Sequence, residues 1–125
     1  MIEFRHKGDF EITTRFFKRA SSKNYVNILE KYGALGVKAL AAATPVDTQN
    51  TANSWEYSIW TLKQSYVLAW SNTNKNNGAT VAILIQYGHA TRNGGYVMGR
   101  DYINPAMRPI LDGLSQQIWQ EVKRL

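Results

Sequence analysis

The spacing of apolar residues changes along the chain from helical to extended and back to helical. From Asn24 to Ala43 they recur every three or four positions, which predicts a long amphipathic helix. Gly33 and Gly36 fall inside it, and each weakens a helix by about 0.5–1 kcal/mol relative to Ala. We therefore expect a bend there or the close approach of another backbone. Thr44-Pro45 predicts the end of this helix, because the residue before Pro is disfavoured in helical conformation.

The segment before this helix is basic and partly apolar. Between Phe10 and Ala20 it holds three apolar and three basic residues, namely Ile12, Phe16, Phe17, Arg15, Lys18 and Arg19. Their spacing predicts a short basic amphipathic helix near the N-terminus.

The central part of the chain has a period of two. Trp55, Tyr57 and Ile59 alternate with polar residues, and a second alternating segment from Tyr66 to Trp70 follows the connection Lys63-Gln64-Ser65. The turn formers between Thr73 and Gly78 lead into Thr80 to Tyr87, a β-branched apolar run that we expect to be a strand buried on both faces. These strands predict an antiparallel meander.

The last third of the chain predicts a long loop and a second long helix. Gly88 to Asp101 holds four glycines and two arginines, and its length suggests function or an interface. Asn104-Pro105 predicts an N-cap followed by Pro at the first helical position, and an apolar stripe runs from Met107 to Leu125. Pro109 predicts a kink or a later start of this helix.

The sequence therefore predicts an α+β fold. It comprises an antiparallel meander of three to four strands packed against two long amphipathic helices, plus the short N-terminal helix. The 125 residues are too few for two independent cores, so we expect residues 1–125 to form one domain.

Composition narrows the possible functions. The chain has no Cys, which removes disulfides, thiol nucleophiles and thiolate metal sites. Its start has no secretory signal pattern, and its apolar runs are far shorter than the roughly 20 residues that span a bilayer. The net charge of +6 favours anionic partners, either nucleic acid or an acidic protein surface.

Catalytic motifs are missing from the sequence. His6 and His89 have no carboxylate at metal-ligand spacing, no nucleophile elbow accompanies Ser, His and Asp, and no acid pair has a glycosidase or nuclease spacing. We therefore expect no enzyme activity, catalytic residue, cofactor or metal ion. Asn93-Gly94-Gly95 lacks the spacing of a phosphate-binding loop and is more simply a turn. His89, at the exit of the expected strand, fits local hydrogen bonding or an interface better than a base.

The four tryptophans allow two interpretations. Trp60 lies on the strand face opposite Trp55, Tyr57 and Ile59, which makes it a candidate for a protein interface. Alternatively, the two helices cover both sheet faces, and Trp55, Trp60, Trp70 and Trp119 are all core residues.

Several segments, taken in order, resemble the family of phage neck and tail-completion proteins, including the tail-completion protein Z group of phage lambda. Ala42-Ala43-Thr44-Pro45-Val46-Asp47-Thr48 and then Thr51 to Tyr57 match the end of a helix, a Thr-Pro-Val-Asp-Thr signature and the following strand. Ile85 to His89 and Arg100 to Ala106 match a strand ending in an aromatic residue and Gly, and the start of the final helix. The resemblance covers about residues 10 to 125.

The matched residues have a structural explanation. Pro45 stops the helix, Asp47 and Thr48 can bond nearby backbone N–H groups, Ser54 leads into the strand that begins at Trp55, and Pro105 opens the last helix. They indicate a folding signature rather than an active site.

The resemblance implies a structural virion protein in the neck or tail of a long-tailed phage, where it joins head to tail or completes the tail. It implies a homo-oligomeric ring, commonly six-fold, stacked on head-closure, tail terminator and tail tube proteins and assembled in the bacterial host cytoplasm. No catalysis, cofactor or membrane is implied, and the positive charge would line a DNA channel or meet acidic faces of adjacent rings. The expected contact residues are Trp60, His89, Arg92, Asn93, Gly94, Gly95, Tyr96 and Arg100.

A small nucleic-acid-binding module is the alternative. It is motivated by the net charge and by Arg15, Lys18, Arg19 and Lys23 beside Phe16 and Phe17, a combination found in single-strand binders. The simpler interpretation of this segment is a solvated basic face with two core phenylalanines.

Overall fold

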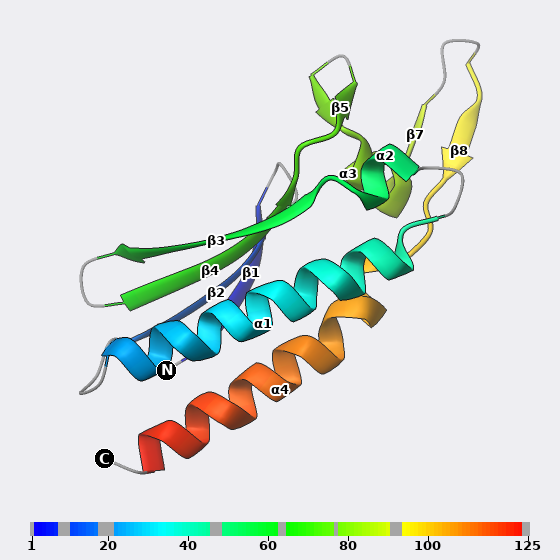
Figure 1. The fold of residues 1–125 in the computed structure, drawn as a ribbon. Helices are drawn as coiled ribbons and strands as arrows, with labels where there is room; N and C mark the ends of the chain where they lie inside the picture. The colour runs from blue at the N-terminus through cyan, green and yellow to red at the C-terminus, as the bar shows by residue number, and fades with distance from the viewer. Residues whose placement is uncertain are drawn as a thin grey trace.

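The protein is represented by a computed structural model that describes residues 2–7, 11–17, 22–45, 49–62, 65–76, 78–90 and 94–123 (Figure 1). It combines helices and antiparallel strands, so the predicted α+β class is confirmed. In chain order the elements are β1 (Ile2–Lys7), β2 (Glu11–Phe17), α1 (Ser22–Ala43), α2 (Gln49–Ala52), β3 (Trp55–Leu62), β4 (Ser65–Asn72), β5 (Lys75–Asn76), β6 (Ala79–Thr80), α3 (Val81–Tyr87), β7 (Gly88–Ala90), β8 (Tyr96–Met98) and α4 (Ile103–Lys123).

The main sheet of the described residues has the order β1-β2-β4-β3, and all of its pairs are antiparallel. The predicted hairpin is confirmed, with Leu62 of β3 opposite Ser65 of β4. Figure 1 shows α1 and α4 side by side along one face of this sheet. Tyr32 of α1 donates a hydrogen bond from its hydroxyl to Oε1 of Gln117 in α4, at 3.1 Å. The molecule therefore has a sheet layer and a layer of two helices.

The predicted short helix between Phe10 and Ala20 is wrong, because its described part is the strand β2. The segment also fits the two-residue period of a strand, in which Ile12, Thr14 and Phe16 share one face. β2 pairs with β4 from Ile12 opposite Trp70 to Phe17 opposite Ser65. The pairing satisfies the backbone N–H and C=O groups on this side of β4, which a helix in the same place would leave without partners.

The predicted third strand of the meander, from Thr80 to Tyr87, is also wrong. Val81–Tyr87 forms α3, and the second neighbour of β4 is β2. Short apolar runs do not distinguish a buried strand from a buried helix by periodicity alone. In the folded chain Ala82 and Gln86, four residues apart, are the buried positions of α3, and this is helical spacing.

The core is centred on the contact between β4 and α1. The fully buried Trp70 donates a hydrogen bond from its indole N–H to the carbonyl oxygen of Gly33, at 3.0 Å. A methyl group added at Gly36 would lie 2.6 Å from Trp70 Cε2, and one added at Gly33 would lie 2.7 Å from Tyr57 Cε2. The expected approach of another backbone is therefore wrong: aromatic side chains lie against the two glycines, and α1 runs through both as one helix.

The two long helices end and begin close to where the sequence predicts. α1 ends at Ala43, directly before Thr44-Pro45. α4 begins at Ile103, one residue before the predicted N-cap Asn104, and Pro105 lies in its first turn, where backbone N–H groups have no helical partner. α4 also runs through Pro109, so the helix does not start late there. Its buried residues are Ile103, Met107, Leu114 and Ile118.

Replacing Gly36 by Ala tests the contact between α1 and Trp70. Helix propensity alone would stabilise the protein by up to about 1 kcal/mol. The added methyl group instead collides with the indole, so we expect Gly36→Ala to lower the free energy of unfolding by about 1–3 kcal/mol in urea titration. Ala34→Gly on the exposed side of α1 is the control and should cost only about 0.5–1 kcal/mol. A stabilised Gly36→Ala variant would contradict this packing.

Candidate interface

The segment predicted as a loop between Gly88 and Asp101 contains a small β-hairpin that projects from the body of the molecule (Figure 1). β7 and β8 pair antiparallel from Gly88 opposite Met98 to Ala90 opposite Tyr96, and we refer to this hairpin as the arm. In β8, Tyr96 is 64% exposed, Val97 47% and Met98 80%. Three consecutive apolar residues of a strand therefore lie open to solvent, which is typical of a protein interaction site.

The base of the arm is held in one position by close backbone packing. α3 ends at Tyr87, and the next residue, Gly88, has a φ of +84° that is unfavourable for residues with a side chain. A Cβ added at Gly99 would lie 2.6 Å from the carbonyl carbon of Tyr87. The Tyr96 hydroxyl donates to the carbonyl oxygen of Tyr87 at 3.0 Å, and the Arg100 N–H donates to that of Ile85 at 2.9 Å. The arm thus leaves the body in a defined direction.

Buried Gln86 joins α3 to the start of α4. Its Oε1 accepts hydrogen bonds from the N–H groups of Tyr102 at 3.1 Å and Ile103 at 3.0 Å, and its Nε2 donates to Asp101 Oδ1 at 2.7 Å. The hydroxyl of Tyr102 donates to the carbonyl oxygen of Ala82 at 3.1 Å. Burial raises the pKa of Tyr102 well above its usual range, so this donor stays protonated. These bonds fix both ends of the segment that carries the arm.

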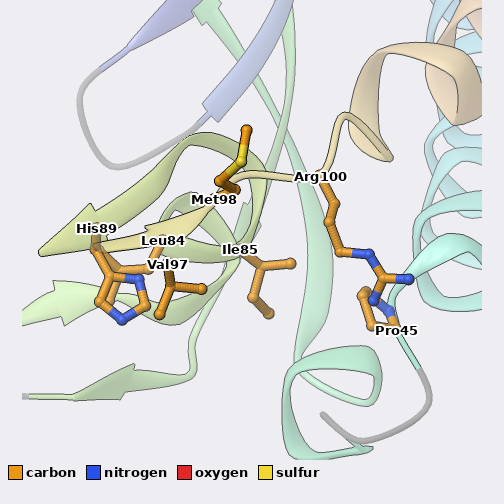
Figure 2. A pocket seen from close by; sticks show the side chains of 7 residues that line it. All are labelled: Pro45, Leu84, Ile85, His89, Val97, Met98 and Arg100. Carbon is orange, nitrogen blue, oxygen red and sulfur yellow. The ribbon is translucent and has the colours of Figure 1, made fainter. Parts of the chain in front are cut away.

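A hollow of about 220 Å³ lies at the base of the arm (Figure 2). Figure 2 shows His89 beside Leu84 and Val97 and the guanidinium of Arg100 beside Pro45. The Nδ1 atom of His89 is buried and has no hydrogen-bond partner in the described part of the chain. The lining residues are Pro45, Leu84, Ile85, His89, Val97, Met98 and Arg100. The lining therefore combines apolar side chains with the imidazole of His89 and the guanidinium of Arg100, so it can contact both apolar and polar groups of a partner.

The predicted contact residues fall on two separate surfaces. His89, Gly94, Gly95, Tyr96 and Arg100 belong to the arm or its base, whereas Arg92 and Asn93 lie outside the described residues. Trp60 is on β3, where it is 40% exposed, on the sheet face away from the helices. The sequence pointed to the arm through its glycines and length. It did not identify Val97 and Met98. The signal that could have found them is the short apolar segment Tyr96 to Met98 between two glycines, because three residues are too few to form a buried strand.

The four tryptophans divide evenly between core and surface. Trp55 and Trp70 are buried, and Trp119 is 58% exposed, with Lys123 Nζ 5.5 Å from its ring centroid. The interpretation that all four are core residues of this chain is therefore wrong. The helices cover only one face of the sheet, which leaves Trp60 on the other.

Thr44, directly after α1, ties that helix to the start of β3. Thr44 Oγ1 donates to the carbonyl oxygen of Leu40 at 2.7 Å and accepts a hydrogen bond from the indole N–H of Trp55 at 2.9 Å. The hydroxyl of Ser54 donates to the carbonyl oxygen of Asn50. Asp47 and Thr48 lie outside the described residues. Thr44, which the sequence marked only as the end of the helix, is the side chain that holds the strand.

The described residues also bear on the metal-site, nucleic-acid and membrane predictions. The described residues contain no group of three or more His, Cys, Asp or Glu side chains that could hold a metal ion. In the basic and aromatic segment from Arg15 to Lys23, residues 18–21 lie outside the described ranges. No helix within the described ranges has the length and apolar character needed to cross a membrane. Comparison with family models, curated proteins and solved structures gave no match.

Replacing Gln86 by Leu tests how the arm is anchored. The change leaves the N–H groups of Tyr102 and Ile103 buried without an acceptor, so we expect the free energy of unfolding to fall by about 1–3 kcal/mol. The amides of Tyr102 and Ile103 should also exchange hydrogen faster. Gln116→Leu on the exposed side of α4 is the control and should change stability by less than about 0.5 kcal/mol. Unchanged stability and protected amides in Gln86→Leu would rule out this role.

Proposed function

We propose that this protein is a structural virion component of a tailed phage, located in the neck or at the completed end of the tail. In this role it helps to join head and tail as a ring of identical subunits, without catalysing a reaction. The observation that carries the proposal is the anchored arm with its exposed Tyr96, Val97 and Met98. The ordered motifs that resemble neck and tail-completion proteins support the same role.

An exposed apolar strand favours assembly for a thermodynamic reason. Apolar surface in water costs free energy, and contact with another protein surface removes that cost. In a connector the assembled state is the working state, so surface of this kind would be covered there. The fixed base at Gly88 and Gly99 supports the role, because an arm that is already ordered loses less entropy on binding.

The charge of the chain agrees with either of two positions in such an assembly. A net charge of +6 attracts DNA phosphates if the subunit faces a channel, and attracts acidic protein surfaces if it faces a neighbouring ring. Exposed basic residues lie on several elements, including Lys31 and Lys38 of α1 and Arg108 of α4. Charge supports an anionic partner in both cases.

Electron microscopy of particles made without the gene tests the proposal. A joining role predicts complete heads and complete tails that remain separate, whereas overlong or malformed tails would indicate tail termination. Supplying the intact protein should restore joined particles, and supplying a Tyr96→Ser, Met98→Ser variant should restore few of them. Leu35→Ser, which alters an exposed apolar residue on α1, is the matched control and should restore them fully. Normal infectious particles without the protein would refute the proposal.

A nucleic-acid-binding module remains the second candidate, favoured by the positive charge. It predicts tight binding to DNA at about 50 mM salt that weakens steeply as salt increases, because bound counterions are released from the phosphates. Fluorescence anisotropy with a labelled duplex and a labelled single strand measures this directly. If neither binds at about 50 mM salt, this candidate is removed.

A further inference from the structure

The outer edge of β3 is open in the described part of the chain. β3 pairs with β4 over its whole length, from Trp55 opposite Asn72 to Leu62 opposite Ser65, and no other described strand pairs with it. Its second side therefore carries a row of backbone N–H and C=O groups. Such an edge is a ready template for another strand.

The exposed surface of this edge is acidic and apolar. Among its eight residues β3 has one carboxylate, Glu56, and no Lys or Arg. Glu56, Ser58 and Trp60 are exposed and lie on the sheet face away from the helices. Trp60 is directly opposite the buried Val67, so the indole extends an apolar area across the strands.

The arm has the complementary properties. Between Gly88 and Arg100 the sequence has two Arg and no carboxylate, and the Arg100 side chain is exposed. β8 pairs only with β7 among the described strands, so its outer side is open as well. An apolar strand with a free edge, followed by the exposed Arg100, therefore matches the free edge of β3 with its Glu56 in both charge and backbone hydrogen bonding.

Within one chain the two strands do not pair, because among the described strands β3 pairs only with β4 and β8 only with β7. In Figure 1 the arm projects at one end of the molecule, and β3 runs away from it to finish at the other end. A contact between them must join two copies. Because it uses different surfaces on each copy, it is a heterologous contact, which closes into a ring when the rotation between subunits allows it.

We propose that β8 of one subunit adds to the outer edge of β3 in a second copy of this chain. In an antiparallel register that places Arg100 opposite Glu56, Tyr96 and Met98 lie on the same sheet face as Trp60 of that copy, and Val97 points to the other face. This inference rests on the proposed ring-forming function and specifies the contact that forms the ring. It also accounts for the exposed arm, since strand addition would cover the apolar side chains of β8 and pair its open edge.

Cross-linking of single-cysteine variants tests this contact, and the natural chain has no Cys to interfere. Met98→Cys is mixed with Ser58→Cys and treated with a short bismaleimide, whose reach tolerates a small shift in strand register. We expect a cross-linked dimer several-fold more abundant than with Met98→Cys and Ala34→Cys, which places the second thiol on the exposed side of α1. The variant that carries both Met98→Cys and Ser58→Cys should give a ladder whose largest closed species reports the number of subunits.

Charge reversal provides an independent readout by sedimentation equilibrium. Glu56→Lys should weaken self-association about tenfold, and Arg100→Glu should do the same, because each places like charges across the contact. The chain that carries both reversals should associate nearly as well as the natural one. Asp112→Lys, which reverses an exposed acid on α4, is the control for the change in net charge and should have a smaller effect.

A monomer at all concentrations that gives no specific cross-link overturns this inference, as does equal cross-linking to the Ala34→Cys position. Electron microscopy separates this result from the proposed function. If particles need the protein but the contact is absent, the connector role stands and its ring uses other surfaces. If the contact forms but particles do not need the protein, the connector role fails and the contact remains.

Discussion

The arrangement of this molecule depends on the contact between the indole of Trp70 and the glycine side of α1. The hydrogen bond from Trp70 Nε1 to the carbonyl oxygen of Gly33 buries a polar group with its partner, and Gly36 leaves the ring room to lie against the helix. Because Trp70 is on the central strand β4, this contact sets the distance between the sheet and the helix layer. Glycine is an unfavourable residue within a helix, and its cost here is offset by the packing of two large aromatic rings.

The fixed distance between the layers determines where the rest of the chain can lie. α1 holds α4 along one face of the sheet, and Thr44 ties the end of α1 to Trp55 at the start of β3. α3 then connects to the beginning of α4 through Gln86. The arm emerges between these two helices, so its direction is inherited from the core although none of its β8 side chains is buried there.

This organisation separates the parts that hold the fold from the parts that are available to partners. The residues around Thr44 and Trp55 are used internally, because their side chains bond to each other and to the end of α1. The groups that remain exposed are backbone edges, apolar side chains and unbalanced positive charge. Those are the components of an assembly surface, and the proposed connector role uses all three.

The sequence by itself determined the two long helices, the end of α1 at Thr44-Pro45 and the β3–β4 hairpin, because each rests on a periodicity or a proline that acts locally. It also marked the glycine-rich arm segment as a candidate interface, but it left open whether Trp60 belongs to the core. The tertiary structure decided the rest. The apolar residues of Val81–Tyr87 fit a buried strand as well as a buried helix, and the surrounding structure made this segment α3. Glu11–Phe17 became β2 because β4 offered an edge to pair with. The exposure of Val97 and Met98 likewise follows from the arm's projection beyond the core, which no local pattern of residues encodes.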